Sequence, residues 1–427
     1  MEKQEALKLL QIQELRPAQN QVLNAFTTGQ DAICIIATGS GKSAIFQMLS
    51  LMSECLVLVI EPHLALEIDQ VRQLRKWGIS AAFINSTQSP EERRRALEKI
   101  RDGSLRLLYL TPEMLQNKTV AGVLKQASIG GIMIDEAHCV IKQGPGFRED
   151  YLLIPDFVRK LHTRPVIGAF TATATPATEA QIIDKLKMQS PFVYRGSVTR
   201  ANVRLSVIEI GRDLGGRKDA AVIEQRKREE IRHLLKKQMK KSGKVIIYCN
   251  TVKRVKQLAK HLKKKGFSVD SFYGACEKKA ERLQRFASGD VRVMVATNAF
   301  GLGVNIPDIR LVIHHSPSIG LDEYVQEAGR AGRDGESAKA VLLWHPYDFT
   351  INRNLIEKSR MELTGKERKE RLDALDALEA YARDRNRCRW RMIRKFFGEK
   401  KGARCDDLCD NCMQKDEAVF KLRISAT

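Results

Sequence analysis

The chain has 427 residues, 43% of them hydrophobic and 29% charged, which excludes disordered and collagen-like proteins and predicts two or three domains with cores of their own. Lysine and arginine number 73 against 51 aspartates and glutamates, giving a formal charge of +22. That surplus favours a polyanionic partner, most commonly nucleic acid; the alternative is a basic protein without such a partner.

The N-terminal stretch MEKQEALKLLQIQELR is polar and amphipathic and lacks the apolar segment of a secretory signal. No apolar run reaches the ~18 residues that span a bilayer. We therefore expect an intracellular protein with no membrane association, in the nucleus of a eukaryote or in the cytoplasm and nucleoid of a bacterium. In such a reducing compartment, five scattered cysteines are predicted to fill the core as thiols: Cys34, Cys55, Cys139, Cys249 and Cys276.

Short apolar runs alternate with longer helical patterns as far as residue 346. Helical patterns lie, for example, at 63–77 and 90–102. Because parallel strands need crossover helices, the alternation predicts two parallel α/β units in series, joined near 196–200. The predicted strands are 31–37, 55–60, 105–110, 129–134 and 165–170, followed by 244–250, 291–297, 310–316 and 338–344.

Two segments stand outside that alternation. Residues 211–243 are dense in lysine and arginine and contain DLGGRKD, which predicts a loop leading into a helix. The basic face of this segment either is solvated or contacts phosphate. Residues 351–397 have a helical pattern and lead into a cluster of cysteines.

The segment ATGSGKS (37–43) follows the first strong strand pattern and opens a helical one. Its glycines let the backbone wrap a phosphate, and the helix N-terminus supplies free N–H groups. Lys42 is suited to reach the β- and γ-phosphates, and the Ser43 hydroxyl to bind Mg²⁺. The alternative is a glycine-rich turn that binds nothing. The candidate nucleotide-binding residues are Thr38, Gly39, Ser40, Gly41, Lys42 and Ser43.

A second strand pattern runs directly into two carboxylates in GIMIDEAHCV (131–140). Burying unpaired charge is costly, so adjacent acids at the end of a strand imply that they hold something. We assign Asp135 to Mg²⁺ across from the phosphate loop. We assign Glu136 to orienting or deprotonating the attacking water.

The segment FTATATP (170–176) ends another strand pattern with hydroxyl groups. Thr171 and Thr173 are candidates for linking the nucleotide site to a bound strand. The second unit carries ATNAFGLGVNIP (296–307) and QEAGRAGRDG (326–335).

Two arginines in the latter segment, Arg330 and Arg333, are three residues apart and share a face if the segment is helical. They are candidates for stabilising the charge that develops in phosphoryl transfer. Structural ion pairs are the alternative.

Together these motifs resemble those of the superfamily-two helicases and, within them, the RecQ family of DNA helicases, over residues 10–413. LRPAQ (15–19) is similar to the family's adenine-recognition motif, which implies that Arg16 and Gln19 contact the base. The resemblance also implies a nucleotide contact for Gln326. TPE, DEAHCV and AFGLG follow in the family's order, and QEAGRAGRDG has Ala328 where the family usually has threonine.

Four clustered cysteines have the spacing C-x16-C-x3-C-x2-C: Cys388, Cys405, Cys409 and Cys412. One thiolate from a helix and three from a following turn can close a tetrahedral zinc site with no open position for catalysis. Surplus reduced cysteines are the alternative. The zinc subdomain of RecQ proteins resembles this segment.

The sequence departs from the family pattern in two places that bear on function. Ile12 stands where the family usually has a tyrosine stacked on adenine. The family's aromatic-rich loop, roughly SQWGHDFRPDY, reads IKQGPGFREDY (141–151) here. Phe147 and Arg148 of this loop remain candidates for DNA binding and coupling.

The resemblance implies two RecA-like parallel-sheet domains, 1–199 and 200–346, then a small helical zinc-binding subdomain, 347–415, and a tail, 416–427. It implies an ATP-dependent DNA helicase that moves 3′ to 5′ on single-stranded DNA and unwinds duplexes in repair or recombination. ATP, Mg²⁺ and structural Zn²⁺ are the expected cofactors, single-stranded and tailed duplex DNA the expected partners, and a monomer the expected state.

Two alternatives stay open. One is an RNA helicase or remodeller, against which the cysteine cluster counts. The other is a DNA-stimulated ATPase that binds DNA without efficient unwinding, which the altered loop and the short chain favour.

Overall fold

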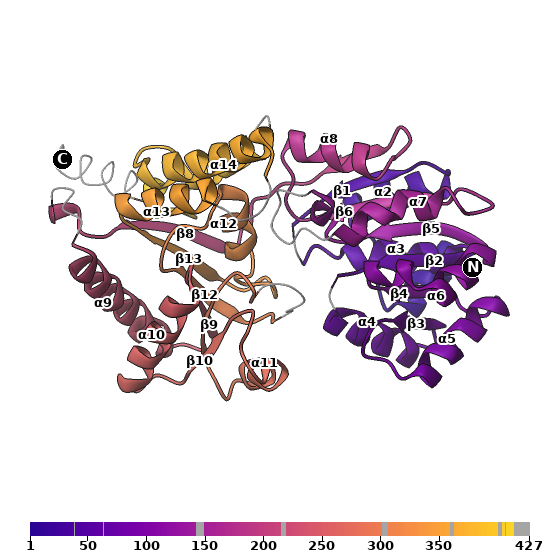
Figure 1. Cartoon of the computed structure of the whole chain (residues 1–427), viewed down its shortest axis with the longest axis horizontal. Helices are drawn as coiled ribbons and strands as arrows, with labels where there is room; N and C mark the ends of the chain where they lie inside the picture. Colours follow the sequence, from indigo (N-terminus) through magenta and orange to yellow (C-terminus); the bar gives the residue numbers. More distant parts are fainter. Residues whose placement is uncertain are drawn as a thin grey trace. The chain divides into compact units, whose positions relative to one another are not determined.

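The computed structural model describes residues 1–37, 39–62, 64–141, 149–214, 219–300, 306–358, 363–399, 404–405 and 407–413, the side chains of 64–66 and 214 excepted. The chain forms two compact units, Met1–Val198 and a second that begins at Thr199 (Figure 1). No helix in these ranges combines the length and the apolar character that crossing a membrane requires.

The first unit is built on a parallel sheet of seven strands in the order β3-β4-β2-β5-β6-β1-β7. The strands are β1 (Ala32–Ile35), β2 (Leu56–Ile60), β3 (Ala81–Ile84), β4 (Leu107–Leu110), β5 (Ile129–Ile134), β6 (Val166–Thr171) and β7 (Phe192–Arg195). The helices are α1 (Lys3–Leu9), α2 (Pro17–Thr27), α3 (Lys42–Met52), α4 (Leu64–Lys76), α5 (Pro90–Arg101), α6 (Lys118–Gln126), α7 (Ile154–Val158) and α8 (Pro176–Lys185). Short 3-10 helices are η1 (Pro112–Gln116), η2 (Ala137–Val140) and η3 (Glu149–Leu153).

Both faces of this sheet are buried, as a parallel sheet with crossover helices requires. Along β2, Leu58 and Ile60 pack in the core on one face, whereas Val57 and Val59 pack in the core on the other. Strands β5, β6 and β1 are neighbours and run parallel, so the loops that follow them open at one edge of the sheet. That edge brings the candidate site residues together.

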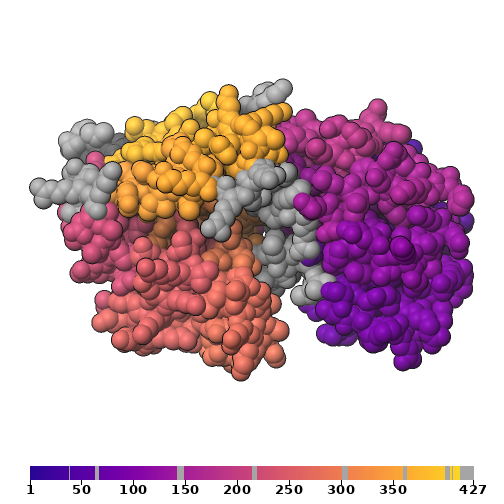
Figure 2. All heavy atoms as spheres, viewed as in Figure 1, coloured from indigo at the N-terminus to yellow at the C-terminus, as the bar shows by residue number. Residues whose placement is uncertain are grey.

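The second unit has a parallel sheet of six strands in the order β10-β11-β9-β12-β13-β8. The strands are β8 (Val203–Glu209), β9 (Lys244–Tyr248), β10 (Val269–Phe272), β11 (Val293–Ala296), β12 (Ile309–His314) and β13 (Ala338–Trp344). The helices are η4 (Arg212–Leu214), α9 (Ala220–Met239), α10 (Val252–Lys264), α11 (Lys279–Ser288), α12 (Leu321–Ala328), α13 (Pro346–Glu357), α14 (Gly365–Arg383) and α15 (Arg389–Phe396). In the space-filling view the C-terminal helices, orange to yellow, cover one side of this unit (Figure 2).

The prediction of two parallel-sheet units in series is confirmed. The sequence patterns missed β3, β7, β8 and β10. Polar residues interrupt the apolar run in β7, β8 and β10, which read FVYR, VRLSVIE and VDSF. Strand β3 is apolar, but its run AAFI is only four residues long. The helical pattern over 351–397 is divided among α13, α14 and α15 rather than forming one helix.

Candidate functional site

The phosphate-loop residues lie between β1 and α3. Gly39 and Gly41 have φ of 83° and 81°, the left-handed region that glycine adopts without strain. A Cβ at Gly41 would lie 2.5 Å from the Gln19 amide nitrogen, so a side chain there would also clash. The segment then enters α3 at Lys42, and the N-terminus of a helix is a favourable place for an anion. Thr38 lies outside the described residues.

Lys42 pairs directly with the first acid of the DEAH segment. Its ammonium lies 3.1 Å from the Asp135 carboxylate, and both side chains are 8% exposed. Burial by itself lowers the pKa of a lysine, but the negative charges of Asp135 and Glu136 outweigh it and hold the pKa of Lys42 above its ordinary value. This pair sits where β1 and β5 end, so the adjacent carboxylates do have a cationic partner.

Glu136 has a strained backbone, with φ 48° and ψ 44°. Its carboxylate lies 3.3 Å from Nδ1 of His138, and the same nitrogen lies 3.1 Å from the Thr171 hydroxyl at the end of β6. The Thr171 hydroxyl also donates a hydrogen bond to the Thr173 carbonyl at 3.2 Å. A chain of polar contacts therefore joins the second acid to the FTATATP segment.

Two residues to which the sequence patterns gave no role, Tyr151 and Gln70, form hydrogen bonds with groups at this edge of the sheet. Tyr151 is fully buried, and its hydroxyl donates a 3.1 Å hydrogen bond to the Asp135 carbonyl. The Ser43 hydroxyl accepts a 2.9 Å hydrogen bond from the Gln70 amide of α4. Tyr151 ends the loop 141–151, whose sequence gave no indication of this contact, and Gln70 belongs to no motif. Phe147 and Arg148 of the altered loop lie outside the described residues.

The family resemblance implies that Arg16 and Gln19 contact adenine. In the structure, the Gln19 side chain is already hydrogen-bonded to two backbone groups. Gln19 accepts a 2.8 Å hydrogen bond from the Arg16 backbone N–H and donates one of 2.8 Å to the Gly41 carbonyl. Gln19 is buried and Arg16 is exposed at the start of α2. The glutamine therefore ties α2 to the phosphate loop.

The arginine segment lies in the second unit. Helix α12 ends at Ala328, so Arg330 and Arg333 lie in the turn that follows and the shared helical face does not exist. Arg330 is 7% exposed, and its charge opposes the rise that burial causes in the pKa of Tyr248. Gln326, on α12 itself, is half-buried.

This turn is held from two sides. The guanidinium of Arg200, which the sequence reasoning left without a role, donates to the carbonyls of Gly329 and Gly332 at 3.2 and 2.7 Å. Glu327 accepts hydrogen bonds from the Ser318 hydroxyl at 2.7 Å and lies 2.9 Å from His314. The position of the arginine segment within the second unit is thus fixed by buried polar contacts.

The clustered cysteines converge. The four Sγ atoms of Cys388, Cys405, Cys409 and Cys412 all lie within 4.8 Å of one another. A tetrahedral site with Zn–S distances of about 2.3 Å places its sulfurs about 3.8 Å apart, and the separation of the Cys405 and Cys412 sulfurs is 3.8 Å. The residues present therefore fit zinc. N–H groups of Arg389 and Arg404 point at the Cys409 and Cys412 sulfurs, each at 3.4 Å, as is common around metal-bound thiolates.

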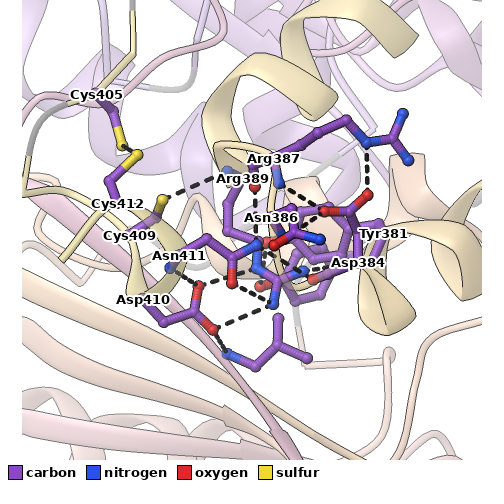
Figure 3. A network of polar contacts seen from close by, with 12 residues as sticks. Tyr381, Asp384, Asn386, Arg387, Arg389, Cys405, Cys409, Asp410, Asn411 and Cys412 are labelled. Atoms are coloured by element: carbon purple, nitrogen blue, oxygen red, sulfur yellow. Dashed lines mark hydrogen bonds and ion pairs between the residues drawn. The ribbon is translucent and has the colours of Figure 1, made fainter. Parts of the chain in front are cut away.

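A buried arginine ties this cluster to the body of the second unit (Figure 3). The Arg389 guanidinium donates to Asp410 at 2.9 Å, and Asp410 in turn accepts from the Val207 backbone N–H of β8 at 2.9 Å. The Leu205 N–H donates to the Leu408 carbonyl at 3.0 Å. Residues 408–410 therefore cover the edge of β8, which would otherwise present unpaired backbone groups.

Of the scattered cysteines, four are buried and Cys55 is half-buried. Burial raises the pKa of Cys34 to about 12, so this thiol stays protonated and unreactive beside the phosphate loop.

Three family models match the chain: DEAD/DEAH box helicase over residues 16–182, helicase conserved C-terminal domain over 226–335 and RecQ zinc-binding over 346–413. The ATP-dependent DNA helicase RecQ of Pasteurella multocida is 34% identical over 418 residues, which cover 96% of this chain and 62% of that protein. The RecQ helicase of Bacillus subtilis is 35% identical over 405 residues, which cover 94% of this chain and 65% of that protein. The RecQ helicase of Synechocystis is 34% identical over 335 residues, which cover 77% of this chain and 67% of that protein. The chain thus spans less than two thirds of the first two of these relatives.

Among solved structures, Dbp5 of S. cerevisiae bound to RNA and ADP BeF3 aligns with a TM-score of 0.60 at 16% identity, over 98% of this chain and 96% of that one. The DUF1998 helicase MrfA bound to DNA aligns with a TM-score of 0.63 at 19% identity, over 82% of this chain and 49% of that one. At these identities the likeness concerns the fold alone.

Proposed function

Because this chain belongs to the RecQ family of helicases, we propose that it is an ATP-dependent DNA helicase whose first unit binds and hydrolyses the nucleotide. The observation that carries the proposal is the buried Lys42–Asp135 pair at the carboxyl edge of the first sheet. The second support is the converging cysteine cluster, which lies in the segment matched by the RecQ zinc-binding family model.

In this proposal Lys42 binds the phosphate charge, and Asp135 and the Ser43 hydroxyl hold Mg²⁺. The metal, when bound, neutralises charge on the phosphate oxygens. Glu136 accepts the proton of the attacking water. The contact of His138 with both Glu136 and Thr171 then connects hydrolysis to the Thr171–Thr173 segment, where we place the coupling to DNA.

We further propose that Arg330 and Arg333 stabilise the charge that develops in phosphoryl transfer. Arg200, by holding the turn that carries them, is a positioning residue. The four cysteines hold structural Zn²⁺ and keep the edge of β8 covered. Movement from 3′ to 5′, a part in repair or recombination, and a monomeric state complete the proposal.

A strand-displacement assay with 3′-tailed and 5′-tailed duplexes tests this function, with Glu136→Gln as the inactive control. Displacement of only the 3′-tailed duplex, lost in Glu136→Gln, is the expected result. DNA-stimulated ATP hydrolysis without displacement would favour the alternative of an ATPase that binds DNA without efficient unwinding. Equal stimulation by single-stranded RNA would favour an RNA remodeller.

A further inference from the structure

An open groove of about 680 Å³ runs between α9 and α10, which lie side by side in the second unit (Figure 1). Apolar residues of both helices, such as Ile231 and Leu262, pack in the core beneath the groove. The groove is lined by four arginine or lysine side chains and one histidine: Arg228, Arg232, Arg254, Lys265 and His261.

The spacing of these cations follows the helices. Arg228 and Arg232 are one turn apart on α9, and Arg254, His261 and Lys265 recur at steps of seven and four residues along α10. At 1.5 Å per residue, the step from Arg254 to Lys265 rises about 16 Å. One DNA strand carries a phosphate about every 3.4 Å of helix axis, so this length can face several consecutive phosphates.

The two carboxylates of the groove are already engaged. Glu224 lies 2.8 Å from Arg228, 2.5 Å from Arg254 and 3.1 Å from His315. Glu229 accepts a 3.0 Å hydrogen bond from the Gln225 amide. Glu224 therefore offsets charge near the N-terminal ends of the two helices, whereas Glu229 lies midway along α9 and has no ion pair among the described residues.

The other end of the groove keeps its positive charge. Among the described residues, no carboxylate lies within ion-pair distance of Arg232, His261 or Lys265, and the buried Nε of Arg232 and Nε2 of His261 have no hydrogen-bond partner. Burial, and then the charges of Arg228, Lys265 and Arg232, lower the pKa of His261 below its ordinary value. An anion bound here would relieve that repulsion.

A smaller cavity of about 190 Å³ shares Glu224 and Arg254 with the groove and continues to Asn250 and Thr251, directly after β9. The end of the groove at Glu224 and Arg254 therefore opens towards the carboxyl edge of the second sheet, and Arg232, His261 and Lys265 lie towards the other end. Alanine is the sole apolar residue type in the groove lining, so it offers no anchor for the aromatic or aliphatic side chains of a peptide. Recognition by charge alone suits a phosphate backbone.

We propose that the groove between α9 and α10 is a nucleic-acid site that binds consecutive phosphodiester groups, in addition to any contact at the motif segments. The proposal rests on the nucleic-acid partner of the proposed function. Under this proposal, helix α9 of the basic segment 211–243 contacts phosphate and is not only solvated.

The test compares two double variants that remove the same charge from the same helices. Arg232→Gln with Lys265→Gln removes two cations of the groove that have no acidic partner there. Lys237→Gln with Lys263→Gln removes two exposed cations outside the groove lining. Binding of a fluorescein-labelled oligothymidylate and of a labelled duplex is measured against salt concentration by anisotropy. The His261 ring resonance, assigned from its loss in His261→Gln, is titrated with and without each oligonucleotide.

In the groove variant the slope of log K against log salt should fall by roughly 1.4 for the single strand, because each phosphate contact contributes roughly 0.7. The control variant should keep the wild-type slope, and oligonucleotide should raise the pKa of His261. The strand form that gives both effects identifies the ligand. Equal slopes in the two variants would overturn the proposal. So would a pKa of His261 that DNA does not change, or one that polyglutamate changes and DNA does not. Failure of unwinding with an intact His261 response would overturn the helicase function and leave the groove standing.

Discussion

The side-chain amide of Gln70 donates a 2.9 Å hydrogen bond to the hydroxyl of Ser43. Gln70 lies on α4, and Ser43 lies in the first turn of α3. The Tyr109 hydroxyl donates to the Gln70 carbonyl oxygen at 2.6 Å, which fixes the amide with its N–H₂ towards the serine. The hydroxyl that we propose as a Mg²⁺ ligand is therefore oriented by a residue 27 positions along the chain.

Gln70→Ala should weaken Mg²⁺ binding, because residues that orient a ligand typically contribute about 10–100-fold to metal affinity. The Mg²⁺ concentration that gives half-maximal ATP hydrolysis should rise by on the order of tenfold, with little loss at saturating metal. Gln73→Ala, on the exposed side of the same helix, is the matched control. A Mg²⁺ dependence equal to that of the control would show that the contact does not position the ligand.

Glu136→Gln should retain ATP binding and reduce hydrolysis by about 10²–10⁴-fold, because an amide cannot accept the proton of the attacking water. Lys42→Ala should instead lose ATP binding together with turnover, since it removes the cation of the phosphate loop. Binding of a fluorescent ATP analogue separates the two effects. The exposed Glu98→Gln serves as control. Hydrolysis by Glu136→Gln at the wild-type rate would reject Glu136 as the base.

The part of the site that the sequence predicts consists of residues next to one another in the chain. The phosphate loop, the Asp135–Glu136 pair and the cysteine cluster each follow from residue types at short, fixed spacing. Sequence patterns gave no role to Gln70, Tyr151, Arg200 or Asp410, because these roles depend on partners brought close only by the fold.

The spacing of the arginine segment does not produce a shared helical face, for a related reason. Arg330 and Arg333 are three residues apart, but α12 ends at Ala328. Gly332, at φ 57°, turns the chain back, and a Cβ there would lie 2.6 Å from the Glu336 carbonyl. The three glycines of GRAGRDG were the local indication that a turn, and not a helix, carries the arginines.

The cysteine cluster should bind one Zn²⁺ per chain. Cys409→Ser should lose the metal and uncover the edge of β8, because residues 408–410 form hydrogen bonds with the backbone of that strand only while the cluster is closed. Amide exchange at Leu205 and Val207 should then accelerate, and Cys55→Ser should leave both amides protected. A metal-free protein in which Leu205 stays protected would argue against a structural zinc.

A half-buried acid on α12, Glu323, should make stability depend on pH. Burial, followed by the charges of Asp322 and Glu327, raises the pKa of Glu323 from 4.5 to about 8. Between these values the folded protein binds more protons than the unfolded chain, so the free energy of unfolding should decrease as pH rises through this window. Glu323→Gln should reduce the pH dependence of the free energy of unfolding. Urea unfolding from pH 5 to 8.5 measures it, because this range covers the interval between the two pKa values of Glu323. The exposed Glu281→Gln should keep the wild-type slope.

The loop whose sequence departs from the RecQ pattern should couple DNA binding to ATP hydrolysis only weakly. Residues 142–148 lie outside the described residues, but the loop ends at Tyr151, whose hydroxyl contacts the Asp135 carbonyl. A change in the loop can therefore reach Asp135, the acid that we propose to bind Mg²⁺, through Tyr151. Gln143 stands where the family has tryptophan, and base–aromatic stacking contributes about 1–3 kcal/mol per base.

DNA should therefore stimulate ATP hydrolysis only weakly in the wild-type protein, and Gln143→Trp should increase that stimulation. Gln143→Leu adds apolar bulk without an aromatic ring and should not. Tyr151→Phe, combined with Gln143→Trp, should cancel the gain, because it removes the hydrogen bond through which the loop end contacts Asp135. The measurement is the ratio of ATP hydrolysis rates with and without single-stranded DNA. Strong stimulation of the wild-type protein that survives Phe147→Ala and Tyr151→Phe would place the coupling in another element.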